Sequence, residues 1–457
     1  VQSVLTRAEG EFAYDVTLLP GAMSVLQVDS DLVGVTLDYP APFAKSADSE
    51  QPLMVELTFG GESTALRATL DRQLQMNLAV DSLSDAYSGL VYLGTPGDGM
   101  RVRRLNPTAP GIEVLGSVDQ IDLELWAEVI SDIQARTPGS AMTAGMESLT
   151  GTAGVSVGRL LAFDEQFDNV NVTVQKSVSN WTIGLLSESV SGELEIPLQS
   201  DQPWRMDLDH LHLDVSLSDD ADLIASAADP TLEEVLLDLQ DLPTVEYELP
   251  REDPLAGLDP RTFPYIALKV DELTLAGADY GSWDFLVKSD AAGALFSDLQ
   301  VNLRGLNIGN EEEPAEFRWV YDGQQHRSVL NGLVSAADLA PVLSAFGYAP
   351  SIESRAARFD ARLHWDGSPA YFSALGLNGD IDVQVNNGRF RQRAGVANSA
   401  LRLISFINFD ALVRRLRFSD DLARAGLSYD EIRGSVNLSQ GLVTIEDRLQ
   451  IIGPASL

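Results

Sequence analysis

One short stretch has the residue spacing of a hydrolase nucleophile. Residues Gly154 to Gly158 read Gly-Val-Ser-Val-Gly and match the G-x-S-x-G pattern, in which a turn between a buried strand and a helix exposes the serine. The residues before this stretch lack a buried-strand pattern, and residues 159–174 predict strands and a turn instead of a helix. Because Val155 and Val157 alternate with Ser156, we expect a half-buried strand here and a protein that is not an enzyme.

A second stretch has the spacing of a metal site on a strand. His210, His212 and Asp214 are two residues apart, so their side chains would project from one face of a strand. The alternative is an ordinary solvent-exposed face, with Leu211 and Leu213 on the apolar side. We favour the alternative and expect no metal ion. The sequence contains no P-loop, dinucleotide-binding or zinc-protease motif, so we expect no cofactor either.

The element that would carry these histidines has an irregular pattern. By strict alternation, Met206 and Leu208 share the histidines' face, although both side chains are apolar. The apolar side therefore changes from one face to the other near Asp209 and His210. A β-bulge, which inserts one extra residue into a strand, is the expected cause.

The composition excludes several classes of protein. The 457 residues include 31 Lys and Arg against 68 Asp and Glu, a formal charge of −37, which argues against nucleic acid as a partner. The absence of cysteine excludes disulfides and thiolate metal sites. An apolar share of 45% is typical of a folded chain, and no apolar run is long enough to span a membrane. Since the chain starts at Val1 and stops after a strand-like run, we expect it to be part of a longer polypeptide.

Alternating apolar and polar residues dominate the chain and predict short β-strands. Clear examples are residues 55–59, 74–80, 170–174 and 381–385, each flanked by turn-forming residues. Strands follow one another with few helical patterns between them, which favours antiparallel pairing. The expected fold is mostly β: an elongated, curled antiparallel sheet with an open groove, built from repeated hairpins. A few short α-helices are expected at loops and near the C-terminal end.

Helical spacing occurs in only a few places. We expect helices over residues 118–135, 231–239, 336–346, 398–407 and 411–416. Ser335 is the expected N-cap of the third helix, and Gly347 is its expected stop.

The chain also repeats itself weakly. Residues 157–174 align with residues 270–287 at an offset of 113, and residues 206–213 align with 268–275 at an offset of 62. Because the offsets differ, we expect stacked hairpins with variable insertions and not a strict solenoid. The expected organisation is a β-rich segment at 1–117, an inserted helix at 118–140, a β-rich repeat segment at 141–330 and a β/helix segment at 331–457.

A sheet with one apolar face must bury that face against something. It either closes into a sandwich or barrel, or curls into a trough whose lining contacts a ligand, and the pattern leaves both possibilities open. For a trough, the alternation predicts these lining residues: Leu208, Leu211, Leu213, Val215, Leu268, Val270, Leu273, Leu275, Ile381, Val383, Val385, Val436, Leu438, Val443 and Ile445.

One C-terminal stretch is basic in an otherwise acidic chain. Residues 389–433 contain nine Arg and five acidic residues, which gives +4. Arg402, Arg414, Arg415 and Arg417 flank the apolar helical pair and could contact a membrane surface or a partner. The alternative is an ordinary helix that closes one end of a sheet.

The last 200 or so residues resemble the YhdP branch of the AsmA-like family. The resemblance is carried by Asp338 to Gly347, Leu363 to Pro369, Leu377 to Ile381, Gly388 to Phe390, Leu401 to Ile407, Arg414 to Leu416, Phe418 to Asp420 and Gly434. Upstream it is thinner, at Leu123 to Trp126 and Trp204 to Leu211.

This resemblance implies a periplasmic part of a Gram-negative envelope protein whose full-length form is anchored in the inner membrane, with the anchor outside this chain. It implies that the β-groove carries phospholipid acyl chains between the inner and outer membranes, with outer-membrane or other envelope proteins as further possible partners. The alternative is a structural or interaction protein that assists envelope assembly without conducting lipid. The family offers no catalytic residue to carry over.

Overall fold

The computed structural model describes residues 13–453 apart from several segments. The segments outside the description are 18–22, 61–62, 82–86, 96–110, 137–150, 163–164, 178, 200, 215–252, 254, 276, 347–349, 351, 373–375, 391–427, 440–441 and 446–448. The chain divides into two compact units, residues 1–211 and 212–457.

The first unit is a sheet of sequentially paired strands. They are β1 (Ala13–Thr17), β2 (Ser24–Ser30), β3 (Leu53–Phe59), β4 (Ser63–Leu70), β5 (Leu74–Asp81), β6 (Tyr87–Leu93), β7 (Gly111–Asp122), β8 (Gly151–Ala162), β9 (Glu165–Lys176), β10 (Asn180–Leu186), β11 (Val190–Pro197) and β12 (Trp204–Leu213). Each strand pairs with the next one along the chain, and most pairs are antiparallel.

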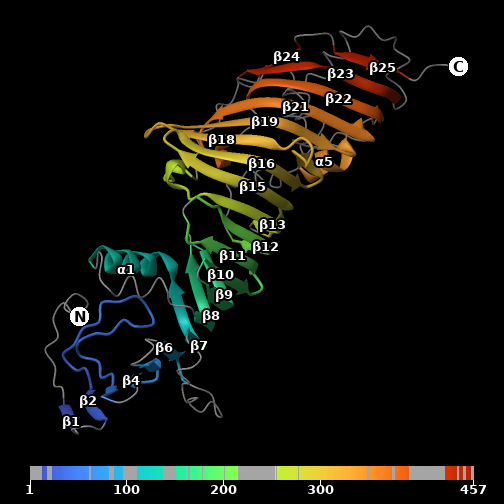
Figure 1. Ribbon diagram of the computed structural model, residues 1–457. Helices are drawn as coiled ribbons and strands as arrows, with labels where there is room; N and C mark the ends of the chain where they lie inside the picture. Colours follow the sequence, from blue (N-terminus) through green and yellow to red (C-terminus); the bar gives the residue numbers. More distant parts are fainter. Residues whose placement is uncertain are drawn as a thin grey trace, which may run out of the picture. The chain divides into compact units, whose positions relative to one another are not determined.

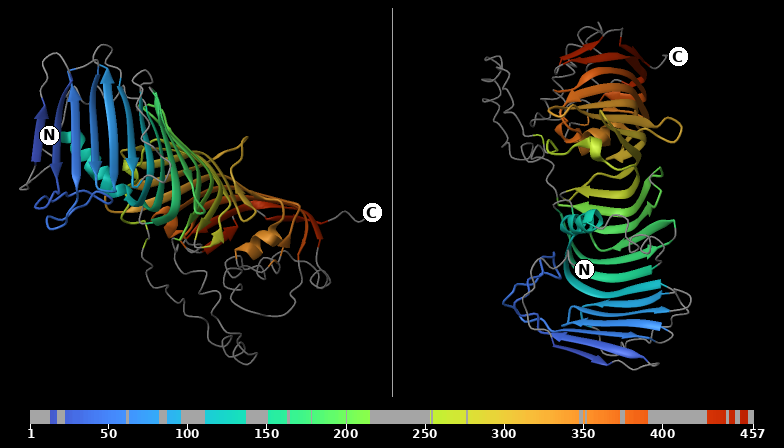
Figure 2. Two further views of the ribbon diagram at one scale, coloured as in Figure 1. Left: turned by 90° about the horizontal axis from the view of Figure 1, so that it is seen from below. Right: turned by 60° about the vertical axis from the view of Figure 1, so that its left-hand side comes forward.

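The second unit follows the same plan (Figure 1). Its longer strands are β13 (Ile266–Leu275), β15 (Ser282–Asp290), β16 (Gly293–Leu303), β18 (Ala315–Tyr321), β19 (His326–Ala336), β21 (Ala356–Asp366), β22 (Asn378–Phe390) and β23 (Ser428–Ser439), paired antiparallel in this order. Its short strands are β14 (Ala278–Asp279), β17 (Leu306–Ile308), β20 (Ile352–Glu353), β24 (Leu442–Ile445) and β25 (Gln450–Ile452). Figure 2 shows the twist of β16 to β22 from two further sides.

These strands confirm the predicted mostly β fold of hairpins, with one correction. β7 pairs parallel with both β6 and β8, so pairing is not antiparallel throughout. Parallel neighbours need a crossover connection, and helix α1 (Leu123–Arg136) lies in the connection from β7 to β8.

The α1 helix starts later than predicted. Residues 118–122 continue β7, and Val118 is buried. The Asp122 Oδ1 atom accepts a hydrogen bond from Leu125 N at 3.0 Å, so this aspartate caps the helix. Within α1, Trp126 stacks on Tyr39 and donates a hydrogen bond from Nε1 to Ala41 O at 2.9 Å. These contacts attach α1 to the 31–51 loop.

The third predicted helix is shorter than expected. Helix α5 spans Leu339–Ala345 with Asp338 as its N-cap, whereas Ser335 and Ala336 still belong to β19. Asp338 is the cap because its carboxylate accepts from both Ala340 N (3.1 Å) and Ser354 N (3.0 Å). The predicted stop at Gly347 and the predicted helices at 231–239, 398–407 and 411–416 lie outside the described residues. Among the described helices, none is long and apolar enough to cross a membrane.

The weak internal repeat corresponds to equivalent hairpins. Val157 pairs with Val170 across β8 and β9. At the offset of 113 these residues align with Val270 and Trp283, which pair across β13 and β15. The repeated pattern in the sequence therefore reflects a repeated cross-strand register.

Candidate functional site

The first unit has one apolar and one polar face, which the strand register defines row by row. Directly paired residues on β2, β3, β4 and β5 project from the same face. One such row is Leu26, Leu57, Leu66 and Leu78, all half-buried. The next row, one residue along each strand, is Gln27, Glu56, Arg67 and Asn77. Leucines thus line one face of these strands and polar side chains line the other.

The same division continues through β8 to β12. The apolar row is Val155, Val172, Leu185, Gly192 and Leu208. The neighbouring row contains Ser156, Asn171, Leu186 and Ser191.

The Ser156 hydroxyl lies in this second row. Its Oγ donates to Asn171 Oδ1 at 2.7 Å. Ser156 is at the middle of β8, between β7 and β9, and not on a strand-to-helix turn. The predicted strand at this motif is confirmed, and the serine lacks the exposed turn that a hydrolase nucleophile needs.

The predicted bulge in β12 is also confirmed. Gly192 pairs with Leu208 and Ser191 pairs with His210, so Asp209 is the extra residue. Val190 then pairs with Leu211. Because Val190 and Gly192 are two residues apart on β11, the bulge places Leu208 and Leu211 on the same apolar face.

The histidines of β12 form no metal cluster in the part of the chain that the structure describes. His210 Nε2 lies 3.3 Å from Ser187 O. His212 is exposed, and its Nε2 lies 3.7 Å from Glu272 Oε1, within ion-pairing range.

In the second unit, the apolar face crosses β16, β18, β19, β21, β22 and β23. One row of directly paired residues is Phe296, Phe317, Leu330, Leu363, Gly379 and Leu438. The row on the opposite face contains Glu316, Asn331, Arg362, Asp380 and Asn437, all polar. Polar and charged side chains of both signs therefore lie on one side of these strands, and apolar side chains lie on the other.

Aromatic side chains form a continuous series on this apolar face. Ring centroids are 5.3 Å apart for Phe285 and Phe296, 5.6 Å for Phe296 and Phe317, and 5.7 Å for Phe317 and Trp365. Phe372, which is half exposed, continues the series from Trp365 at 5.5 Å. We did not predict these rings as lining residues, although the period-two pattern of Phe317, Trp319 and Tyr321 in the sequence signals such a face.

A segment that we call the strap (Asp253 and residues 255–263) lies over one end of the strands of this face. It includes the 3₁₀ turn η1 (Pro260–Thr262), and Pro260 is fully buried. Phe263 packs edge-on against Trp319 at 5.6 Å, and its carbonyl oxygen accepts from Ser289 Oγ at 2.7 Å. Asp253 accepts hydrogen bonds from both the backbone N (2.8 Å) and the Oγ (2.5 Å) of the buried Ser368.

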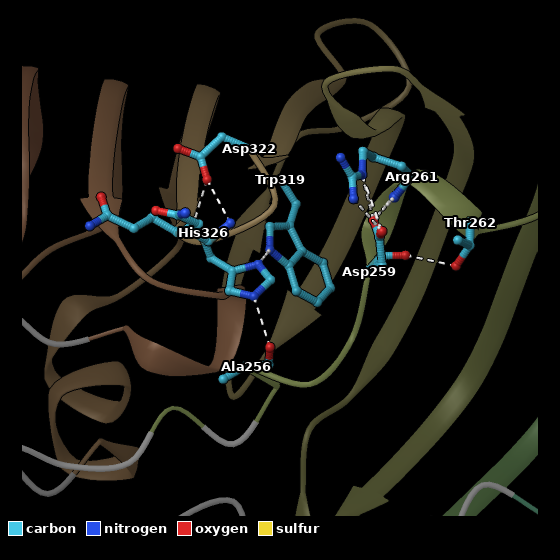
Figure 3. A network of polar contacts seen from close by, with 9 residues as sticks. Ala256, Asp259, Arg261, Thr262, Trp319, Asp322 and His326 are labelled. Atoms are coloured by element: carbon cyan, nitrogen blue, oxygen red, sulfur yellow. Dashed lines mark hydrogen bonds and ion pairs between the residues drawn. The ribbon is translucent and has the colours of Figure 1, made fainter.

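His326 joins the strap to the sheet (Figure 3). Its Nδ1 atom accepts a hydrogen bond from Trp319 Nε1 at 3.0 Å. The proton of a neutral ring must then be on Nε2, which lies 3.1 Å from Ala256 O and donates to it. His326 is 8% exposed, so both polar atoms of a nearly buried ring are satisfied by this one tautomer.

Helix α5 covers the opposite end of the same strands. Val342 packs in a buried cluster with Ala336, Ala357, Val385 and Ile432. The strap and α5 thus bound the apolar face, and Phe296, Phe317 and Leu330 lie between them with partly exposed side chains.

The register places many of the predicted lining residues on these apolar faces. In the second unit they are Leu268, Val270, Ile381, Val383, Val385, Val436, Leu438 and Ile445. Leu208 and Leu211 lie on the apolar face of the first unit, and Leu213 is half-buried. Val215 lies outside the described residues, as does the side chain of Val443.

Leu273 and Leu275 follow a second irregularity. Asp271 and Glu272 are both exposed, which interrupts the alternation, and Leu273 N and O bond to Gly281 O and Tyr280 N, each at 2.8 Å. Leu273 and Leu275 are half-buried beyond it. That any of these residues contacts a lipid stays a prediction. Arg402, Arg414, Arg415 and Arg417 lie outside the described residues.

Comparison with known proteins identifies the family of the chain. The YhdP protein family matches residues 2–456. The chain is 22% identical over 447 residues to the intermembrane phospholipid transporter YhdP of Escherichia coli (strain K12), a match that covers 96% of this chain and 32% of that protein. The chain therefore spans about a third of the length of this relative, and no solved structure matches it. With a family match over nearly its whole length, the chain belongs to the YhdP family.

Proposed function

We propose that this chain is a section of a lipid conduit in which the apolar sheet faces hold phospholipid acyl chains. One observation carries the proposal: an apolar row and a polar row lie on opposite faces of the same strands. Phe317 and Leu330 are on one side, and Glu316 and Asn331 are on the other. Within each unit the described strands pair into one sheet, so these strands do not include the second sheet that a closed sandwich needs.

The energetics favour an apolar path for such a cargo. Moving a 16-carbon acyl chain into water costs on the order of 13 kcal/mol, at ~0.8 kcal/mol per CH₂ group. A continuous apolar face removes most of this cost because the chain leaves one apolar surface for another. The sliding step needs no catalytic residue and no cofactor, and the polar head group can stay in water.

The relative supports the same proposal. The E. coli protein is a phospholipid transporter between membranes, and this chain is similar to about a third of it. We propose that the chain works in the periplasm as part of a longer protein that is anchored in the inner membrane, and that it carries phospholipids towards the outer membrane. The negative charge of the chain, formally −37, would limit adhesion to anionic head groups.

Site-specific photo-crosslinking tests the proposal. Leu330 is half-buried on the apolar face, and the next residue, Asn331, is exposed on the polar face. A photo-reactive residue at position 330 should capture phospholipid in cells, and one at position 331 should not. Equal labelling at the two positions would refute a one-sided conduit. Absence of lipid at both positions would favour a structural role in envelope assembly.

A further inference from the structure

A polar pocket lies beside α5, where the sheet is locally interrupted. Glu353 pairs with Arg389 and Ala356 pairs with Asn386, both on β22. The two residues between them form no register pair, although Arg355 N still donates to Asn386 O at 3.1 Å. Opposite this gap, Asn387 has a φ of 50°, an uncommon left-handed conformation for a residue other than glycine. Such outliers persist only where the surroundings impose them, and they concentrate at functional sites.

The neighbouring Gly388 is required by close packing. A Cβ atom at this position would collide with Glu353 O and with the hydroxyl of Tyr429. The Tyr429 side chain extends from β23 to β20, where its hydroxyl donates a hydrogen bond to Glu353 O at 2.6 Å. The interruption is therefore held by specific contacts between residues of β20, β22 and β23.

The gap opens a pocket of about 420 Å³. This volume is within the range of small-molecule sites. Its lining includes Asp338, Glu353, Arg355, Asn387, Arg389 and Tyr429. Two arginines and two acidic residues thus contribute to the lining of one cavity, and their formal charges cancel.

The two arginines differ in how they are held. Arg389 forms an ion pair with Glu353 through its Nε and Nη2 atoms. Arg355 is exposed, and its side chain forms no hydrogen bond or ion pair with any residue in the described part of the chain. Burial, followed by the charges of Asp338 and Glu353, raises the pKa of Tyr429 to about 12. Its hydroxyl therefore stays protonated into the alkaline range.

The pocket adjoins the apolar face directly. The Tyr429 ring is buried in the cluster of Val385 and Ile432, and it packs 5.2 Å from the Phe390 ring. One side chain therefore joins the polar cavity to the apolar surface. An amphiphile that places its chains on the apolar face would bring its head group to this cavity.

We propose that this pocket binds the zwitterionic phosphate head group of a phospholipid, of the phosphoethanolamine type. The guanidinium of Arg355, assisted by Arg389, binds the phosphate, and the carboxylates of Glu353 and Asp338 face the ammonium group. The inference rests on the proposed function, since it assumes that acyl chains occupy the adjoining face. It adds one specific binding site for the head group along the conduit.

Binding of short-chain lipid to the whole chain tests this inference. The probes are dihexanoyl phosphatidylethanolamine below its micelle concentration and glycerophosphoethanolamine, which has the same head group without chains. Arg355→Gln should weaken binding of the lipid about tenfold, as expected for one lost charge-assisted contact. The matched control is Arg362→Gln, because Arg362 is exposed on the polar face of β21 and should leave the affinity unchanged.

Three outcomes would overturn the inference. The first is equal affinity of wild type and Arg355→Gln for the lipid, together with equal affinity of Arg389→Gln. The second is equal weakening by Arg355→Gln and Arg362→Gln, which would indicate a general charge effect. The third is equally tight binding of glycerophosphoethanolamine, which would indicate a site for soluble phosphodiesters. Crosslinking of lipid at position 330 separates these results from failure of the conduit itself.

Discussion

Leu185 and Leu186 are consecutive residues of β10, and their side chains project from opposite faces of the sheet. Leu185 pairs with Val172 and Gly192 on the apolar face, and its side chain is half-buried. Leu186 pairs with Asn171 and Ser191, and its side chain is 59% exposed. The two positions have the same side chain and are adjacent in sequence. Substitutions at them therefore show whether lipid binding depends on the face of the sheet or only on the hydrophobicity of the side chain.

Charge on the apolar face should therefore act at one of these positions only. Leu185→Glu is expected to lower the phospholipid that co-purifies with the chain at least about threefold, because a carboxylate on an apolar surface must be desolvated when a chain lies over it. Leu186→Glu is expected to leave the lipid content unchanged. Mass spectrometry of lipid extracted from both purified variants measures the effect. Equal lipid loss in the two variants would contradict the division between the faces.

The bulge in β12 gives a prediction about stability. Gly192 has a φ of 146°, and a Cβ atom there would meet Asp207 O and, at 2.6 Å, Leu208 Cα. Gly192→Ala should lower the free energy of unfolding by about 2–3 kcal/mol, through backbone strain and displacement of β12. Chemical denaturation measures the change.

A glycine in open space provides the control for this experiment. Gly257 lies in the strap, and a Cβ atom added there would meet none of the described residues within 4 Å. Gly257→Ala should change the free energy of unfolding by no more than ~0.5 kcal/mol. A Gly192→Ala protein as stable as Gly257→Ala would show that β11 and β12 adjust without cost.

Local pattern predicts many of the strands and their faces. The alternation of Leu66 with Arg67, or of Ile381 with Asp382, follows directly from the period of a strand, and the register confirms it. The bulge at Asp209 is predictable for the same reason, because a shift in alternation is visible along the strand itself. These features depend on residues that are close in sequence.

Features that depend on distant residues could not be predicted. The parallel pairing of β7 is decided by which strands meet after a long connection, and alternation does not report direction. The strap is held by a contact between Asp253 and Ser368, which are 115 residues apart. His326 is isolated in the sequence because Ala256, its partner, is 70 residues away.

A buried lysine organises the 31–51 loop of the first unit. The Lys45 Nζ atom donates to Leu32 O at 2.7 Å, Val35 O at 2.9 Å and Ser46 O at 2.8 Å, and Lys45 is 7% exposed. Lys45→Met should lower the free energy of unfolding by about 2 kcal/mol or more, since buried carbonyl oxygens lose their donor.

Lys269 is the matched control for this substitution. It forms an exposed ion pair with Asp271 at 3.1 Å. Lys269→Met should change the free energy of unfolding by less than ~0.5 kcal/mol, because exposed ion pairs contribute little. Equal denaturation midpoints for the two variants would mean that the loop carbonyl oxygens find water in place of the ammonium group.

The hydroxyl of Tyr429 gives a prediction about alkaline pH. Burial, with Asp338 and Glu353 nearby, raises the pKa of this phenol from 10.0 to about 12 in the folded protein. The folded state then holds this proton more tightly than the unfolded state, so its contribution to stability is complete below pH 10 and is lost as the pH rises from 10 through 12. Comparison with Tyr429→Phe isolates the contribution, since the variant lacks the titrating group. The wild type should lose stability relative to Tyr429→Phe across this interval, and the difference in their ultraviolet phenolate absorbance should rise near pH 12. A difference spectrum that rises near pH 10 would show a hydroxyl open to water and would contradict the buried position of Tyr429.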